Sequence, residues 1–557
     1  MPLKSPLPWG RSRPSVWAMA VLAIALLMVL PLGAVLASAV TQSGDVWGHL
    51  AATVLPQYVF NSLGLMVGVG LGVLLLGVST AWLVTMCQFP GRRWFEWALL
   101  LPLAAPSYLL AYTYTDFLDY FGWVQTTLRT LFGWQSATDY WFPNVRSLGG
   151  AIVLFSLVLY PYVYMLVRVA FLEQSLCTLE ASRALGCNPW RSFRTVALPL
   201  ARPAIAAGTA LALMETLNDF GTVEYFSLPT FTTGIYRTWF GMGDRAAAAQ
   251  LASVSLVFIA VLIGLERLSR RQARYYQSVN QHQSLSTYPL KGLRGLLATG
   301  FCALPIALGL LLPAGLLLAL AVGQWQQLLG NDFWALARHS LILSGASALL
   351  AILLSLVLAY GARLQPGPWV QGGVQAAALG YAIPGAVIAV GILMPVTHLD
   401  NSLATWVEAT WNRPMGLLLS GTPIVLVFAY LVRFLAVALN TVEAGLAKIR
   451  PSLDDAARCL GHGPTATLKQ IHAPLLGGSL LTAAVLVFVD VMKELPATMV
   501  MRPFNFDTLA VRVYQYASDE RLADAAVPAL AILAVGLLPV MLLSWRIAQT
   551  RRRQTGT

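Results

Sequence analysis

Long stretches without a charged residue constrain this 557-residue chain more than any other feature. Eleven of them contain at least 19 residues each, and a helix needs about 20 apolar residues to cross a bilayer. They cover 14–44, 46–91, 97–115, 147–167, 246–265, 295–331, 339–362, 364–399, 414–432, 470–489 and 525–545. A twelfth stretch, 203–217, is interrupted only by Glu215. The pattern predicts an all-α integral membrane protein with about twelve transmembrane helices, because barrel strands would alternate apolar and polar residues.

Composition supports this fold class. Only 11% of the residues are charged and 57% are hydrophobic, whereas a soluble globular protein carries about 25% charged residues. A water-soluble enzyme is therefore excluded, and so is a disordered chain.

The basic residues predict the orientation of the chain in the membrane. If the N-terminus is inside, 26 of the 36 Lys and Arg residues fall in cytoplasmic segments, including the segment from Arg433 to Lys469. Because Lys and Arg concentrate on the cytoplasmic side, both termini are predicted to be cytoplasmic. Basic loops at an anionic inner leaflet account for the net charge of +12, so no nucleic-acid partner is expected.

The chain contains an internal repeat. Residues 180–199 align without gaps with 455–474 at an offset of 275, and 61–70 resemble 339–348 at an offset of 278. We predict a first transmembrane half over 1–267, a cytoplasmic linker over 268–290 and a second half over 291–557. With six helices in each half the copies are parallel, which predicts a pseudo-two-fold axis along the membrane normal and a translocation path on it.

The repeated segment lies in a cytoplasmic loop of each half, over 176–200 and 450–475. Gly186 and Gly461 stand where a helix would end in a left-handed residue, and Pro189 and Pro464 would begin the next helix. Ser452 and Asp455 have the spacing of a capping box. Each loop is therefore predicted to form a helix-turn-helix that docks on a partner.

These loops resemble the EAA loop of binding-protein-dependent ABC importer permeases. The first copy reads Glu180-Ala181-Ser182 with Gly186 and Pro199, and the second reads Asp455-Ala456-Ala457 with Gly461 and Pro474. The resemblance implies that the loops couple the permease to two copies of a cytoplasmic ATPase subunit. It also implies a periplasmic or lipid-anchored binding protein and a place in the bacterial inner membrane. The expected ATPase-coupling residues are Glu180, Ala181, Gly186, Asp455, Ala456 and Gly461.

Further segments, among them 218–226, 493–498 and 502–514, are similar to fused permeases of the ferric-iron type. The resemblance implies an alternating-access permease for ferric iron, with thiamine, phosphonate or polyamine as alternative substrates. A secondary transporter of the major-facilitator kind also has twelve spans, but it lacks two such loops. The chain has no GxxxxGK[ST] motif, so it is expected to be no enzyme and to bind no cofactor, with ATP-Mg held by the partner ATPase.

Two acidic residues recur inside predicted spans at equivalent positions of the repeat, Glu215 and Asp490. A carboxylate inside a bilayer is costly, so such residues mark substrate pathways. We predict an outer gate that would suit a hard cation, formed by Glu215, Asn218, Asp219, Asp490, Lys493 and Glu494. The alternative is structural ion pairing of Glu215 with Arg237 and of Asp490 with Arg512. Histidine spacing indicates no firm metal site.

Overall fold

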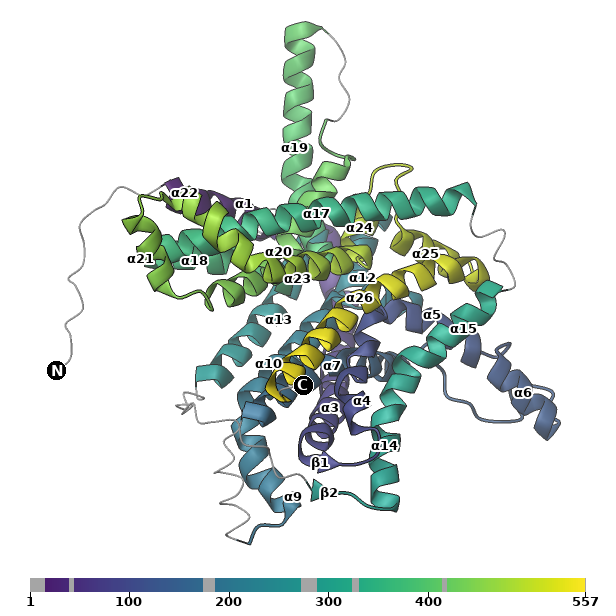
Figure 1. Ribbon diagram of the computed structural model, residues 1–557. Helices are drawn as coiled ribbons and strands as arrows, with labels where there is room; N and C mark the ends of the chain where they lie inside the picture. The colour runs from purple at the N-terminus through teal and green to yellow at the C-terminus, as the bar shows by residue number, and fades with distance from the viewer. Residues whose placement is uncertain are drawn as a thin grey trace.

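A computed structural model describes residues 16–39, 45–173, 186–271, 288–322, 330–412 and 418–555 (Figure 1). Eleven of its helices are long and apolar enough to cross a membrane. A bent pair, Arg92–Ala104 and Ser107–Phe132, makes a twelfth span if the two parts are counted together. The predicted all-α membrane fold with about twelve helices is confirmed.

The first half of the chain contributes six spans and several short outer helices. Its elements are α1 (Val16–Ala39), α2 (Asp45–Thr53), α3 (Leu55–Met86), β1 (Cys87–Gln88), α4 (Arg92–Ala98), η1 (Leu101–Ala104), α5 (Ser107–Leu118), α6 (Trp123–Phe132), α7 (Leu148–Glu173), α9 (Pro189–Ser192), η2 (Phe193–Ala197), α10 (Leu198–Asn218), α11 (Gly221–Tyr225), α12 (Phe231–Tyr236), η3 (Arg237–Gly241) and α13 (Arg245–Arg271).

The second half repeats this order. Its elements are β2 (Tyr288–Pro289), α14 (Leu293–Ile306), η4 (Ala307–Leu311), α15 (Leu312–Val322), α17 (Asn331–Leu364), α18 (Pro368–Ala377), η5 (Leu379–Ala382), α19 (Gly385–Trp411), α20 (Pro423–Leu446), α21 (Pro451–Cys459), α22 (Pro464–Thr467), η6 (Leu468–His472), α23 (Ala473–Met492), α24 (Pro496–Met501), α25 (Leu509–Ser518) and α26 (Leu522–Thr555).

Two of the predicted spans, 97–115 and 364–399, are not continuous helices. The chain turns extended at Ala105 and at Ile383, each followed by a proline, and the first break bends the helix axis by 86°. Proline has no amide hydrogen and disfavours a helical residue before it, so each span splits at this point. The buried Tyr160 hydroxyl donates at 2.8 Å to the carbonyl of Leu99, the C-cap of the preceding helix α4, where helix carbonyls lack backbone partners.

Three helices of each half form a tightly packed core. They are α3, α7 and α10 in the first half and α17, α20 and α23 in the second. In the first core, Gly68 and Gly72 of α3 lie so close to α7 that an added Cβ would meet Ile152 or Ser156. Small residues at these two positions thus permit the close approach of the two helices.

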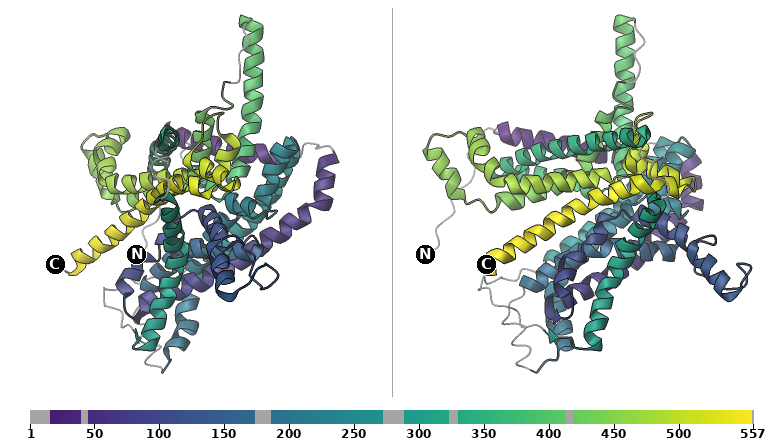
Figure 2. Two further views of the ribbon diagram at one scale, coloured as in Figure 1. Left: turned by 90° about the vertical axis from the view of Figure 1, so that its right-hand side faces the viewer. Right: turned by 45° about the vertical axis from the view of Figure 1, so that its right-hand side comes forward.

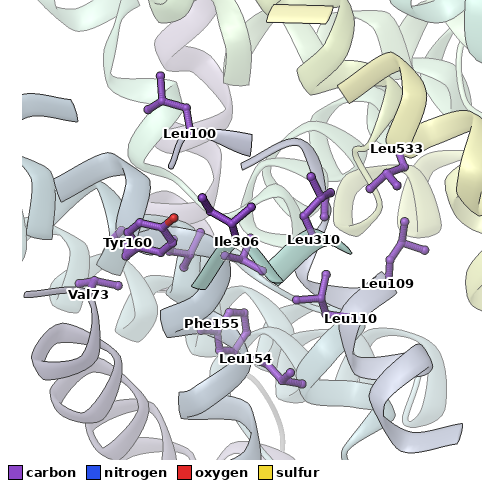
Figure 3. Close-up of a cluster of buried hydrophobic side chains, with 14 of the residues drawn as sticks. Val73, Leu100, Leu109, Leu110, Leu154, Phe155, Tyr160, Ile306, Leu310 and Leu533 are labelled. Atoms are coloured by element: carbon purple, nitrogen blue, oxygen red, sulfur yellow. The ribbon is translucent and has the colours of Figure 1, made fainter. Parts of the chain in front are cut away.

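Peripheral helices of each half pack against the other half. Helix α1 packs against α17, α18 and α19 of the second half, while α14, η4 and α15 pack against α3, α5 and α7 of the first. Figure 3 shows this exchange at side-chain level, with Ile306, Leu310 and Leu533 of the second half among Leu110 and Phe155 of the first. Both buried apolar clusters therefore contain residues of both halves.

The predicted boundaries at 267 and 291 come from the sequence repeat. Helices on either side of them pack against the other half. Most of the predicted linker, residues 272–287, lies outside the described residues. After it, β2 pairs in parallel with β1, so Tyr288 lies opposite Cys87 at the end of α3. Figures 1 and 2 show the two sets of helices diverging toward the ends that carry α9 and α21.

Gly208 of α10 gives a direct test of the close packing in the first core. An added Cβ would lie 2.7 Å from Val163 Cα and 3.0 Å from the Tyr162 carbonyl oxygen, both backbone atoms that cannot move aside. We expect Gly208→Ala to lower the free energy of unfolding by about 1–3 kcal/mol, measured by thermal unfolding in detergent. The matched control is Gly264→Ala in α13, where nothing lies within 4 Å. The control should be neutral or stabilising by up to about 1 kcal/mol, and equal losses in both variants would contradict the packing argument.

Candidate translocation cavity and coupling loops

A cavity of about 100 Å³ lies between the two halves, with room for several water molecules. The structure brings all six predicted gate residues together around it: Glu215, Asn218, Asp219, Asp490, Lys493 and Glu494. Its other polar lining includes Ser107, Tyr162 and Arg433. The role of the six residues as a gate stays a prediction, but their proximity follows from the two-fold repeat.

Glu215 and Asp490 come from equivalent helices but have different partners. The Asp490 carboxylate lies 3.0 Å from the Lys493 ammonium, one turn further along the chain. Among the residues that the structure describes, Glu215 has no hydrogen-bond or ion-pair partner of this kind, and it lines the cavity. Among the described residues, Glu215 is thus the acidic side chain of the lining without a direct hydrogen bond or ion pair.

Asp219 and Glu494 are equivalent in the repeat, and each caps a short outer helix. Asp219 accepts hydrogen bonds from the Thr222 and Val223 amides at the start of α11. Glu494 accepts from the Ala497 and Thr498 amides at the start of α24. A carboxylate at a helix N-terminus satisfies unpaired amides and complements the helix dipole. Both side chains therefore hold the outer wall of the cavity in place.

Arg433 was missed as a cavity residue by the sequence reasoning, which placed it in a cytoplasmic segment. It lies inside α20, and its guanidinium donates to Glu494 at 2.8 Å, with both side chains buried. The signal was present in the six apolar residues that follow Arg433, 434–439. Gly385 leaves room for this pair, since a Cβ there would lie 2.8 Å from the guanidinium.

The second part of one broken span lines the cavity, and the second part of the other contacts a lining residue. At the start of α5, the Ser107 hydroxyl donates to Asp219 at 2.5 Å. At the start of α19, the Gly385 amide donates to the Asn218 side chain at 2.8 Å, which joins the first half to the second. The breaks at the prolines thus place two helix N-termini beside the predicted gate residues.

The alternative prediction, in which Glu215 pairs with Arg237 and Asp490 with Arg512, is wrong. Arg237 pairs with Glu224, and Arg512 pairs with Asp507, so neither reaches Glu215 or Asp490. Among the described residues, no group of three or more His, Cys, Asp or Glu side chains is placed to hold a metal ion.

The repeated loop over 450–475, which we call the second coupling loop, has the predicted turn. Gly461 has a φ of +81°, its amide donates to the Arg458 carbonyl, and the His462 amide donates to the Ala457 carbonyl. This pair of bonds is a Schellman motif, which ends α21. The predicted capping box is wrong, because α21 begins at Pro451 and its N-cap is Arg450. Asp455 and Ala456 are exposed on α21, available to a partner.

Of the repeated loop over 176–200, which we call the first coupling loop, the structure describes residues 186–200. Glu180 and Ala181 lie outside the described residues. Gly186 has a φ of +78°, as its equivalent Gly461 does. The Asn188 side chain then accepts from the Arg191 amide at 2.7 Å and caps the helix that Pro189 begins. The turn chemistry predicted for these positions is confirmed.

A single helical segment connects each coupling loop to the cavity. These segments run over 189–218 and 464–492, and they carry Glu215 and Asp490 near the ends that lie away from the loops. Both contain a π-helical turn at equivalent places, η2 and η6, just after the loop. Such turns often occur at functional sites, and here each lies between a repeated loop and the cavity.

Comparison with known proteins identifies the family. Residues 74–275 match the family described as binding-protein-dependent transport system inner membrane component. The chain is 26% identical over 490 residues to the Fe(3+)-transport system permease protein FbpB 2 of Haemophilus influenzae, covering 87% of this chain and 88% of the relative.

Two shorter relatives match about one half of the chain. The molybdenum transport system permease protein ModB of Escherichia coli is 30% identical over 207 residues, which are 35% of this chain and 87% of ModB. A putative 2-aminoethylphosphonate transport system permease protein, PhnU, of Salmonella choleraesuis is 28% identical over 36% of this chain and 69% of its own. With its helical spans, its repeated loops and these matches, the chain belongs to the binding-protein-dependent transport system inner membrane components, as a multi-pass permease.

Proposed function

We propose that this chain is the permease subunit of an ATP-driven ABC importer for ferric iron, working by alternating access. The observation that carries the proposal is the match to the Fe(3+)-transport permease, which extends over most of both chains. The relatives named for molybdenum and 2-aminoethylphosphonate align with little more than a third of this chain. Ferric permeases of Actinobacillus pleuropneumoniae and Haemophilus influenzae align over 81% and 74% of it.

The charge of the cavity supports a cationic substrate. Its lining contains four carboxylates, Glu215, Asp219, Asp490 and Glu494, but only two cations, Lys493 and Arg433. An anion such as sulfate or a phosphonate would meet net repulsion there, whereas a hard cation prefers oxygen ligands. The absence of a three-ligand cluster among the described residues also suits a passage, because tight binding would slow release.

The proposed assembly contains one copy of this chain, since the repeat supplies both halves. Two cytoplasmic ATPase subunits would dock on the loops at Gly186 and Gly461, bind ATP-Mg and carry out the hydrolysis. A periplasmic or lipid-anchored binding protein would deliver iron at the opposite face. Both termini would be cytoplasmic, which follows from the distribution of Lys and Arg.

The test is transport in proteoliposomes that contain this chain with its ATPase and binding protein. We expect ATP-dependent accumulation of radioactive ferric iron. We also expect that Glu215→Gln with Asp490→Asn lowers the iron uptake rate by about tenfold or more, because unit charges 4 Å apart interact by several kcal/mol at an effective dielectric constant of about 20.

The matched control is Glu408→Gln, an exposed carboxylate at the outer end of α19, which should leave uptake unchanged. Uptake driven by a proton gradient without ATP would favour a secondary transporter. Accumulation of a phosphonate, sulfate, thiamine or a polyamine in place of iron would overturn the substrate assignment. Unchanged iron uptake in the double variant would remove the gate.

A further inference from the structure

The second coupling loop is fastened to the transmembrane helices by three charged or polar side chains that the proposed function leaves unexplained. Asp454 of α21 accepts from Arg363 Nε at 2.8 Å and from His472 Nε2 at 2.5 Å. The side chain of Asp454 is only 17% exposed and that of His472 is fully buried. We call Asp454, Arg363 and His472 the loop clamp.

Arg363 extends the clamp to a third helix. It lies in the last turn of α17, and its two terminal nitrogens donate to the carbonyls of Leu446 and Ile449 at 2.8 and 2.9 Å. Leu446 is the last residue of α20, where helix carbonyls lack partners and a cation is favourable. One guanidinium therefore joins α17, the end of α20 and α21.

His472 joins the clamp to the helix that leads to the cavity. It is the last residue of the π-helical turn η6, directly before α23. Tyr360 of α17 reinforces this junction, because its hydroxyl donates to the Pro464 carbonyl at 3.0 Å and its ring lies 5.3 Å from that of His472. The coupling loop is thus held at both ends by α17.

The first half has no such clamp in its sequence. At the offsets of the repeat, Asp454, Arg363 and His472 correspond to Leu179, Thr85 and Ala197. Aromatic rings occupy this region instead, with Trp82 lying 4.8 Å from Phe193 and 5.6 Å from Phe171. At these three positions the first half therefore carries no charged side chain that could form the same hydrogen bonds.

We propose that Asp454, Arg363 and His472 are positioning residues for energy coupling, which keep the second loop rigid so that movement of the ATPase reaches α17, α20 and α23. The inference rests on the proposed function, since it presumes that the loop docks on an ATPase. Charge-assisted hydrogen bonds are short and strong and fix geometry, which a transmitted movement requires. Coupling through the second loop is accordingly expected to depend on the charge of Asp454.

Asp454→Asn is the central test, because it keeps the size of the side chain and removes its charge. In reconstituted proteoliposomes we expect iron uptake per ATP hydrolysed to fall by about tenfold, the ratio that corresponds to about 1.4 kcal/mol. Binding of the ATPase to the permease should persist, since Asp455 and Gly461 are unchanged. Asp519→Asn, an exposed carboxylate on the outer side, is the matched control and should behave as the wild type.

Two variants of His472 distinguish a loss of loop positioning from general damage to the fold. Gln can place an N–H donor where Nε2 of the imidazole lies, so His472→Gln should retain most coupling. His472→Leu removes the donor and should reproduce the loss seen in Asp454→Asn. Equal coupling in the Gln and Leu variants would overturn the clamp, as would normal coupling in Asp454→Asn.

A spectroscopic measurement reports the position of the loop itself. Cys459, the last residue of α21, is exposed and can carry a spin label once the other four cysteines are replaced by serine. We expect the label to be more mobile in Asp454→Asn and His472→Leu than in His472→Gln or the parent. Equal mobility in all four would contradict the proposal. A parent permease without ATP-dependent iron uptake would instead refute the proposed function and leave the mobility test valid.

Discussion

Valine at Gly461 is expected to abolish ATP-driven uptake while the permease still folds. The φ of +81° lies in the left-handed region, which costs an ordinary residue about 1–2 kcal/mol and a β-branched residue more. An added Cβ would have nothing within 4 Å, so the substitution acts through the backbone alone. The turn would relax, the Schellman bonds would break and α21 would lose its orientation toward the ATPase.

The same reasoning applies to Gly186, whose φ is +78° and whose Cβ position is also open. We expect the double variant Gly186→Val, Gly461→Val to lose both uptake and stable assembly with the ATPase, measured by transport and co-purification. Gly463→Val is the matched control, because Gly463 has a φ of −73° that any residue adopts. Gly461→Asn should retain more activity than Gly461→Val, since Asn tolerates the left-handed region. Normal assembly and uptake in the double valine variant would contradict the docking role of the loops.

Loss of Arg433 is expected to destabilise the whole permease. Arg433→Met would leave the Glu494 carboxylate, whose side chain is fully buried, without its cation. Breaking a buried pair by removing one partner costs about 3–5 kcal/mol, because the remaining buried charge is left without its counter-charge. The measurement is the thermal unfolding temperature of the purified permease in detergent, which should fall strongly.

Two variants make this prediction specific to the buried pair. Arg237→Met removes an Arg from an ion pair with Glu224, but this arginine side chain is 44% exposed, so the cost should stay below about 1 kcal/mol. Adding Glu494→Gln to Arg433→Met should recover part of the lost stability, because no unpaired charge then remains. Similar unfolding temperatures for Arg433→Met and Arg237→Met would show that burial does not determine how much an ion pair stabilises this protein.

Much of the fold followed from the sequence because its signals are local. Apolar length predicts a span, since a bilayer core has a fixed thickness, and twelve spans result. The left-handed turns at Gly186 and Gly461 follow from the freedom of glycine at positive φ. The repeat offset also predicts that Glu215 and Asp490 lie close together, because parallel copies place equivalent residues near one axis. Both residues line the same cavity.

The tertiary structure decided which helices exchange between halves, where two spans break, and that Arg433 pairs with Glu494 beside the cavity. It also decided that Asp454 meets Arg363 and His472 in one half only. Hydropathy and turn chemistry depend on a few neighbouring residues, so they can be read along the chain. A buried ion pair or an exchanged helix depends on side chains far apart in sequence, and only the packed molecule selects those partners.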